Sequence, residues 1–331
     1  MHDYQSEMIK KILVIRNDKI GDLVTCTGVF RELKKGFPES EITAIVSKAG
    51  EQIVLKNKNI DRILVADYPP TKYKNFINYL DILKKLKNQK FDIGIDLRGS
   101  IFNILLLNLL NVKYKIGYYN RYISKFLLDY AHQKDRITKH ANIQRIELLN
   151  KSLGLSSKNY ELEIATDKGD KENLSKFIIE NKLKKFICIV PDASLEYKQL
   201  PLERFDEIIK YVTKNYKDYK IVLIGADFKK MNFLKKENPN ILLPNKIIDL
   251  RVTYLLFKKC DLIIAHDGGL THLGGVADAK MIVFFPEHLA LAYYKPLSKN
   301  AVIISKNAKN ITVKEVEKEI DKFLNNKDRK I

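Results

Sequence analysis

The sequence is poor in the features that mark secreted, zinc-binding and membrane-spanning proteins. Its three cysteines, Cys26, Cys188 and Cys260, include no Cys-x-x-Cys pair. Each lies in an apolar run, which predicts buried free thiols in a reducing compartment rather than disulfides or a zinc site. The N-terminus lacks the apolar core of a secretory signal. The most hydrophobic stretch, IFNILLLNLLNV at 101–112, is too short and too interrupted by asparagine to span a bilayer. We therefore expect a cytoplasmic protein that contacts a membrane only at its surface.

The charge balance is strongly basic. Lysine and arginine number 59 against 40 aspartates and glutamates, for a formal net charge of +19. This excess favours an anionic partner: nucleic acid, an anionic lipid surface or a phosphorylated substrate. The chain has no sustained basic tract and no RNA-recognition or helix-turn-helix pattern, which counts against nucleic acid. A nucleic-acid-binding protein remains the alternative from a non-enzyme class.

Short β-rich runs alternate with amphipathic helical segments along both halves of the chain. Strands are predicted at 11–16, 41–47, 61–67, 91–97 and 114–119 and, after a polar stretch at 165–173, at 186–192, 219–227, 260–267, 280–285 and 301–305. This order is typical of parallel, doubly wound sheets. We predict an α/β protein with two Rossmann-like domains, 1–165 and 166–331, facing a central cleft that binds ligands at the strands' carboxyl ends. The last helix, from about Val313, is expected to pack back on the N-terminal domain.

The first polar stretch that follows a strand is NDKIGD at 17–22. It lacks the Gly-x-Gly-x-x-Gly pattern of dinucleotide-binding loops. Asp22 stands at the expected start of a helix, and Gly21 is expected to form the turn before it. The Asp22 carboxylate either caps the free N–H groups of that helix or faces the cleft as a general base.

Two polar stretches follow strands of the second half. In PDASLEYKQLP at 191–201, Ser194 and Lys198 either hold a diphosphate or belong to a solvated polar loop. After the next strand, Asp227 either accepts hydrogen bonds from a ribose diol or caps a helix.

The stretch AHDGGLTHLGG at 265–275 contains four of the 14 glycines. Gly268 and Gly269 would allow positive φ and a close approach of the backbone to a ligand. The N–H groups of Gly269, Leu270 and Thr271 would point out of a helix N-terminus, an arrangement that binds phosphate. The alternative is a tight turn that binds nothing, with His272 packed so as to hold it. No Asp-x-Asp pair follows a strand, so we expect no metal ion and no cofactor.

Together these stretches resemble the family 9 glycosyltransferases, the lipopolysaccharide heptosyltransferases of Gram-negative bacteria. KILVIRNDKIGDLVTCTGVFRELKKGFPESEI is similar to the start of that family, and DASLEYKQLPLERF is similar to its loop of small or hydroxyl residues followed by lysine. DLIIAHDGGLTHLGGVA is similar to its most specific motif, Asp-x-Gly-x-x-His-Leu-x-Ala. The resemblance covers about residues 9–310. It implies a GT-B fold and an inverting, metal-independent transfer of heptose, usually from ADP-L-glycero-D-manno-heptose, to the inner core of lipopolysaccharide.

The resemblance also implies roles and partners. It makes Asp22 the general base, Ser194 and Lys198 ligands of the diphosphate, Asp227 a ligand of the ribose, Asp267 a ligand of the donor sugar, and Gly268, Gly269, Leu270 and Thr271 the phosphate-binding helix start. The acceptor would be a lipid-linked anionic saccharide, reached by peripheral docking on the inner face of the inner membrane. Cations of the first half would suit that acceptor or are scattered surface charge: Arg98, Arg121, Arg136, Lys139 and His140.

The sequence departs from the family pattern in places, and one departure bears on the donor. FFPEHLALAYYKP at 284–296 lacks the Gly, Thr and Asp of the family's aromatic-Gly-Pro-Thr-Asp-Pro segment. A GT-B transferase or epimerase that uses another nucleotide sugar is therefore the alternative. Gly274 and Gly275 replace small alanines and are expected to loosen that helix.

Overall fold

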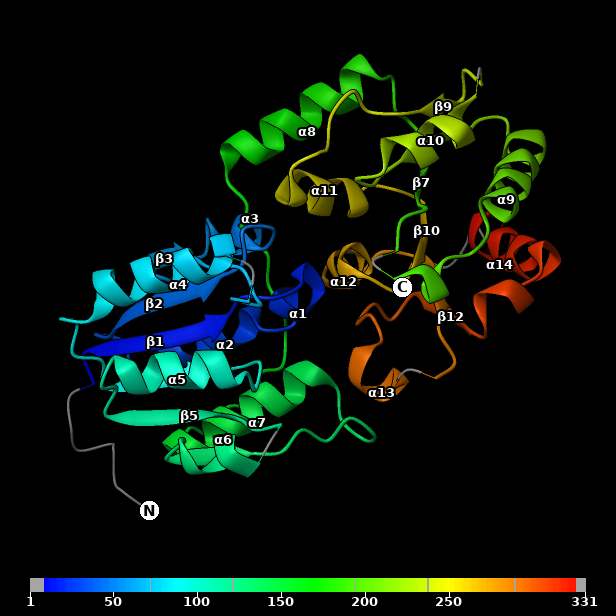
Figure 1. The fold of residues 1–331 in the computed structure, drawn as a ribbon. Helices are drawn as coiled ribbons and strands as arrows, with labels where there is room; N and C mark the ends of the chain where they lie inside the picture. Colours follow the sequence, from blue (N-terminus) through cyan, green and yellow to red (C-terminus); the bar gives the residue numbers. More distant parts are fainter. Residues whose placement is uncertain are drawn as a thin grey trace. The chain divides into compact units, whose positions relative to one another are not determined.

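The computed structural model describes residues 9–71, 73–120, 122–193, 195–236, 238–288 and 290–325. The chain forms two compact units, residues 1–165 and 166–331. Each unit is a parallel sheet covered by helices (Figure 1). The prediction of two Rossmann-like α/β folds is confirmed.

The sheet of the first unit has the strand order β3-β2-β1-β4-β5-β6. Its strands are β1 Lys11–Arg16, β2 Glu41–Val46, β3 Arg62–Val65, β4 Ile93–Asp96, β5 Tyr114–Tyr118 and β6 Tyr130–His132. Its helices are α1 Ile20–Val24, α2 Thr27–Gly36, α3 Glu51–Val54, α4 Tyr73–Leu86, α5 Ile101–Leu109, α6 Tyr122–Phe126 and α7 Ala141–Leu153. Leu13 and Ile15 of β1 pack in one core cluster with α4 and α5. Helix α4 lies in the β3-to-β4 crossover and α5 in the β4-to-β5 crossover; both crossovers run in the same direction across the sheet, so right-handed connections place both helices on one face.

The second unit repeats this order as β9-β8-β7-β10-β11-β12. Its strands are β7 Phe186–Val190, β8 Lys220–Leu223, β9 Ile241–Leu242, β10 Leu262–His266, β11 Met281–Phe285 and β12 Ala301–Ser305. Its helices are α8 Lys168–Glu180, α9 Leu202–Asn215, α10 Phe228–Lys235, α11 Leu250–Phe257, α12 Gly269–Val276, α13 Leu291–Tyr294 and α14 Val313–Asn325, with single helical turns at Glu196–Lys198 and Ala308–Asn310.

Three differences from the predictions have local causes. The short edge strands β6 and β9 were not predicted, because three and two residues show no periodicity. The polar stretch 165–173 holds the start of α8, since Asp167 and Asp170 cap each other's backbone in a capping box. The expectation that the last helix packs on the first half is wrong for its apolar face: Val316, Ile320 and Leu324 are buried in the core of the second unit.

The cysteines are free as predicted, but Cys260 is only partly buried. All three cysteines are free, and Cys26 and Cys188 are buried. The apolar segment 101–112 contains the nine-residue helix α5. In the part of the chain that the structure describes, no helix is long and apolar enough to cross a membrane.

Candidate functional site

Each sheet reverses its strand order at one point, and the candidate residues follow the strands at that point. In the first unit the order reverses between β1 and β4, and in the second between β7 and β10. Asp22 follows β1 and Arg98 follows β4, while Lys198 follows β7 and Asp267 follows β10. Open α/β sheets bind ligands at this topological switch point. Each unit therefore has its own group of candidate residues at the switch point of its own sheet, and we call each group a half-site.

Asp22 is not the cap of its helix. Helix α1 begins at Ile20 and its N-cap is Lys19, so Asp22 lies within the helix. Its Oδ1 lies 2.5 Å from Arg16 Nη2 and 3.8 Å from Arg145 Nη2. Both arginines are buried, whereas the Asp22 side chain is 25% exposed. The structure thus orients this carboxylate between two guanidinium groups and leaves part of it open to a substrate.

Arg16 links Asp22 to a second acid. Its Nε lies 2.8 Å from Asp18 Oδ1, and the other Asp18 oxygen pairs with Arg98. Of the predicted acceptor cations, Arg98 is therefore part of the Asp22 cluster. Arg145 joins from α7, where its Nη1 donates to Thr25 Oγ1. The half-site of the first unit is a compact group of alternating charges.

Lys134 adds a further cation to this half-site. Its amine donates to the Arg98 carbonyl at 2.5 Å. Burial is the main reason that the pKa of Lys134 falls to about 7, and the charges of Arg16 and Arg145 lower it further. Near neutral pH this lysine is only partly charged.

In the second unit, Lys198 and Asp267 form a buried ion pair. Lys198 Nζ lies 2.5 Å from Asp267 Oδ2, and the two side chains are 11% and 7% exposed. The family resemblance assigns them to different parts of a donor, and the structure brings their charged atoms together. A diphosphate at Lys198 would thus lie next to the carboxylate assigned to the sugar.

His266, the last residue of β10, fixes the loop that bears Lys198. Its Nε2 accepts a hydrogen bond from the Leu200 N–H at 2.7 Å. The ring is 2% exposed and packs edge-on against Phe205 and Phe284. Burial lowers the pKa of His266 to about 4. The neutral ring is the form that can accept from Leu200, so protonation would release the Lys198 loop.

This pKa predicts a loss of stability in mild acid. The folded pKa of about 4 lies below the ordinary pKa of 6.5, so the unfolded chain binds more protons between these values. Stability is therefore lost as the pH falls through that window, by up to about 3 kcal/mol from this group. Denaturant unfolding of the wild type and His266→Gln at several pH values should show a shallower fall for the variant. Parallel curves would contradict this account.

The start of α12 is organised by Thr271. Its Oγ1 accepts from the Gly268 N–H at 2.7 Å, so that donor is already occupied. The expected positive φ is wrong for Gly268, whose φ of 179° is extended backbone. A Cβ there would meet only the His266 carbonyl, 3.9 Å away. The space at Gly268, next to the N-terminus of the eight-residue α12, suits an approaching anion.

The other glycines of this stretch serve packing. A Cβ on Gly274 would lie 2.7 Å from Met281 Cε, and one on Gly275 would lie 2.8 Å from the Leu297 nitrogen. The backbone of α12 thus lies against β11 and the segment that follows α13. His272 is also buried, and its N–H donates to the Gly268 carbonyl at 3.3 Å.

Asp227 caps α10 and lies beside a second acid. Its Oδ1 accepts from the N–H groups of Lys229 and Lys230 at 3.1 and 3.2 Å. Asp192, two residues after β7, accepts from the Ala226 and Asp227 N–H groups at 2.6 and 3.0 Å. The helix-cap interpretation of Asp227 is confirmed, and its side chain, 43% exposed, also remains reachable by a ribose.

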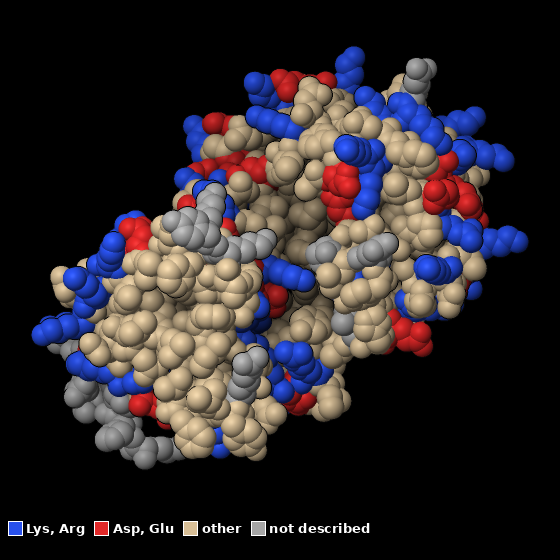
Figure 2. Space-filling model, in the orientation of Figure 1, with Lys and Arg blue, Asp and Glu red and all other residues tan. Residues whose placement is uncertain are grey.

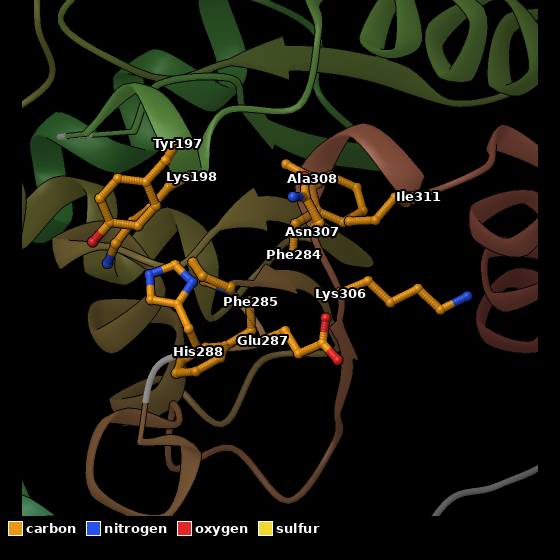
Figure 3. A pocket seen from close by; sticks show the side chains of 11 residues that line it. Tyr197, Lys198, Phe284, Phe285, Glu287, His288, Lys306, Asn307, Ala308 and Ile311 are labelled. Carbon is orange, nitrogen blue, oxygen red and sulfur yellow. The ribbon is translucent and has the colours of Figure 1, made fainter.

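A cavity of about 240 Å³ opens beside Lys198. Figure 3 shows the rings of Tyr197 and His288 next to the Lys198 amine, with ring centroids 4.9 Å apart. Phe284 to His288 line it from the end of β11, so the segment that departs from the family pattern forms part of its wall. Whole-ligand sites usually measure about 300–1,000 Å³, and this cavity fits part of a ligand, such as one sugar ring.

A protein-family model matches most of the chain. Residues 79–323 match the family model of glycosyltransferase family 9 (heptosyltransferase). The chain belongs to glycosyltransferase family 9. A relative, lipopolysaccharide heptosyltransferase 1 of Campylobacter coli, is 26% identical over 290 residues, which are 83% of either chain.

Solved structures show the same GT-B fold. A family 9 glycosyltransferase from Veillonella parvula superimposes with a TM-score of 0.82 at 20% identity, covering 95% of this chain and 97% of that one. The ADP-heptose lipopolysaccharide heptosyltransferase II of Escherichia coli gives 0.77 at 16% identity, covering 95% and 98%. The protein is therefore a glycosyltransferase with the predicted fold.

The remaining predicted acceptor residues of this family 9 enzyme have other partners, are exposed, or lie outside the described residues. Lys139 pairs with Glu147 at 2.7 Å, His140 caps α7 and Arg136 is exposed. Arg121 and Ser194 lie outside the described residues. Within the described ranges, no three His, Cys, Asp or Glu side chains are grouped to hold a metal ion, and metal independence stays a prediction.

Sequence reasoning missed several residues of the two half-sites. These are Arg16, Asp18, Lys134, Arg145, Asp192 and His266. Arg16 and His266 are the last residues of the two strands at the switch points. A polar residue that ends an otherwise apolar strand was the available signal. Arg145 lies on a helix distant in sequence, and nothing local marks it.

Proposed function

We propose that this glycosyltransferase transfers a heptose from ADP-L-glycero-D-manno-heptose to the inner core of lipopolysaccharide, with inversion and without a metal ion. Membership of family 9 and the lipopolysaccharide heptosyltransferases among its relatives support heptose transfer. The observation that carries the proposal is the buried Lys198–Asp267 pair beside the N-terminus of α12. A lysine and helix N–H groups can bind a diphosphate, and the adjacent carboxylate can accept hydrogen bonds from sugar hydroxyls.

The residues divide the chemistry between them. Asp22 takes the proton of the acceptor hydroxyl as its oxygen attacks the anomeric carbon, and the bond from that carbon to the diphosphate oxygen breaks. Lys198 and the first N–H groups of α12 stabilise the charge that the leaving diphosphate gains. Asp227 takes the ribose, and Asp267 orients the sugar. Lys198 and the helix N-terminus do the work that a metal ion does in other transferases.

The donor is tested by thermal stabilisation. ADP-heptose at a hundred times its dissociation constant should stabilise the fold by about 2.7 kcal/mol, whereas UDP-sugars should do so less. The melting temperature is measured with a panel of nucleotide sugars, and ADP and UDP serve as controls. Stabilisation by a UDP-sugar alone would replace the donor and favour the alternative that the 284–296 segment raises.

The acceptor is proposed to be a lipid-linked anionic saccharide at the inner face of the inner membrane. The charge cluster of Arg16, Arg98, Lys134 and Arg145 around Asp22 supports an anionic acceptor. Nucleic acid is the less favoured partner. On the face that Figure 2 shows, Lys and Arg are spread among Asp and Glu rather than gathered in one stripe.

A further inference from the structure

Three consecutive helices of the first unit expose large apolar side chains. They are Phe76, Ile77 and Leu80 of α4, Phe102, Leu105 and Leu109 of α5, and Tyr122, Ile123 and Phe126 of α6. We call these nine residues the apolar surface. Leu109 is 63% exposed, Tyr122 79% and Phe126 81%. Single exposed apolar residues are ordinary, but a group of this size marks an interaction site.

The fold itself does not require these side chains. Helix α4 buries Tyr79, Ile82 and Leu86 against the sheet, and α5 buries Leu106 and Leu107 in the same cluster. Each helix thus has a second apolar side beyond the one that packs on the core. A helix of a globular domain usually has a polar outer side, so the outer sides of α4 and α5 are shaped for a partner.

The three helices lie together on one side of the unit. Helices α4 and α5 pack on the same sheet face, and Asn108 of α5 donates to the Leu127 carbonyl just after α6 at 3.1 Å. Figure 2 shows a broad area without charged residues over this part of the first unit. We call Lys84 and Lys87, on or after α4, and Lys125, on α6, the bordering lysines, because they are exposed and close in sequence to residues of the surface; Lys113, before β5, pairs with Asp92 at 3.0 Å instead.

The apolar surface reaches the half-site of Asp22. The Phe102 ring lies edge-on to the Tyr68 ring, with centroids 6.3 Å apart. The Arg98 guanidinium lies 3.6 Å from the centroid of Tyr68, and Arg98 pairs with Asp18. Tyr68 and Arg98 therefore connect Phe102, a residue of the apolar surface, to the charge cluster around Asp22.

We propose that the apolar surface inserts into the interface of an anionic lipid bilayer. Apolar and aromatic side chains of α4, α5 and α6 enter the headgroup boundary, and the bordering lysines pair with lipid phosphates. The charge favours this occupant over a second copy, because two chains of net charge +19 with lysine borders repel each other. The surface would present a lipid-linked acceptor to Asp22, and in this respect alone the inference rests on the proposed function.

The test is sedimentation with vesicles, which needs neither donor nor acceptor. The full chain is mixed with vesicles of phosphatidylcholine alone or of equal parts phosphatidylcholine and phosphatidylglycerol. The variant Leu109→Ser/Phe126→Ser removes two exposed side chains of the surface. The matched control, Ile179→Ser/Ile247→Ser, removes two from the second unit that are 74% and 61% exposed. The melting temperature of each variant and its mass in solution are measured alongside.

We expect the wild type and the control to bind the anionic vesicles, and the surface variant to bind them at least about tenfold more weakly. Equal binding by both variants, or no binding by the wild type, would overturn the proposal. If the wild type is a dimer in solution and the surface variant is a monomer, the proposal is also overturned and the surface is assigned to a second copy of the chain. If ADP-heptose does not stabilise the protein but the protein binds the anionic vesicles as expected, the proposed function is rejected and this inference stands.

Discussion

Asp22→Asn is expected to lower the turnover number about a hundredfold to ten-thousandfold, the usual contribution of a general base. The amide cannot take a proton from the acceptor hydroxyl, but its oxygen can still accept from Arg16, which lies 2.5 Å from the carboxylate in the wild type. The fold should therefore survive. Release of ADP from ADP-heptose in the presence of the lipid acceptor measures the effect.

The control replaces a carboxylate that has no role in the reaction. Asp218, whose side chain is 81% exposed, becomes asparagine, and its turnover should match the wild type. The melting temperature shows whether Asp22→Asn is folded. Equal turnover of Asp22→Asn and the wild type, with both folded, would remove Asp22 as the base.

Lys198→Met is expected to abolish donor binding and to lower the free energy of unfolding by about 3–5 kcal/mol. The substitution leaves the Asp267 carboxylate buried without its cation, and an uncompensated buried charge carries a cost of this size. Denaturant unfolding measures the stability, and thermal stabilisation by ADP-heptose measures donor binding.

The double variant Lys198→Met/Asp267→Asn separates the two effects. It removes both charges, so most of the stability should return while donor binding and turnover do not. A single variant as stable as the wild type would contradict the buried pair. Normal donor binding by the folded double variant would contradict the role of both residues.

The order of elements was readable from the sequence because buried parallel strands are short apolar runs. All ten predicted strands are present, since runs such as FICIV and LIIAH are buried on both faces of their sheet. The switch-point rule then directed attention to Asp22, Lys198 and Asp267. The predictions that failed concerned which of several available groups a side chain pairs with, and the local sequence does not decide this. Asp22 does lie in the first turn of a helix, as predicted, but the alternative that it caps this helix is wrong, since the N-cap is Lys19 and the Asp22 carboxylate pairs with Arg16.

Gly274 shows the same limit. The sequence suggested a loosened helix or close helix packing, and only the structure shows that the missing side chain brings α12 against Met281. That role depends on the distance between two elements and leaves no local trace.

By itself, the sequence determined the family 9 membership, the two Rossmann-like folds and the net positive charge, because motif spacing, hydrophobic period and composition are properties of the chain. Only the tertiary structure decided that Lys198 meets Asp267, that Arg16 and Arg145 hold Asp22, and that His266 fixes the Lys198 loop. It also decided that α4, α5 and α6 share one exposed apolar surface. The physical reason is range: periodicity is set between neighbours in sequence, whereas a buried charge is satisfied by whichever distant group the fold brings within about 3 Å.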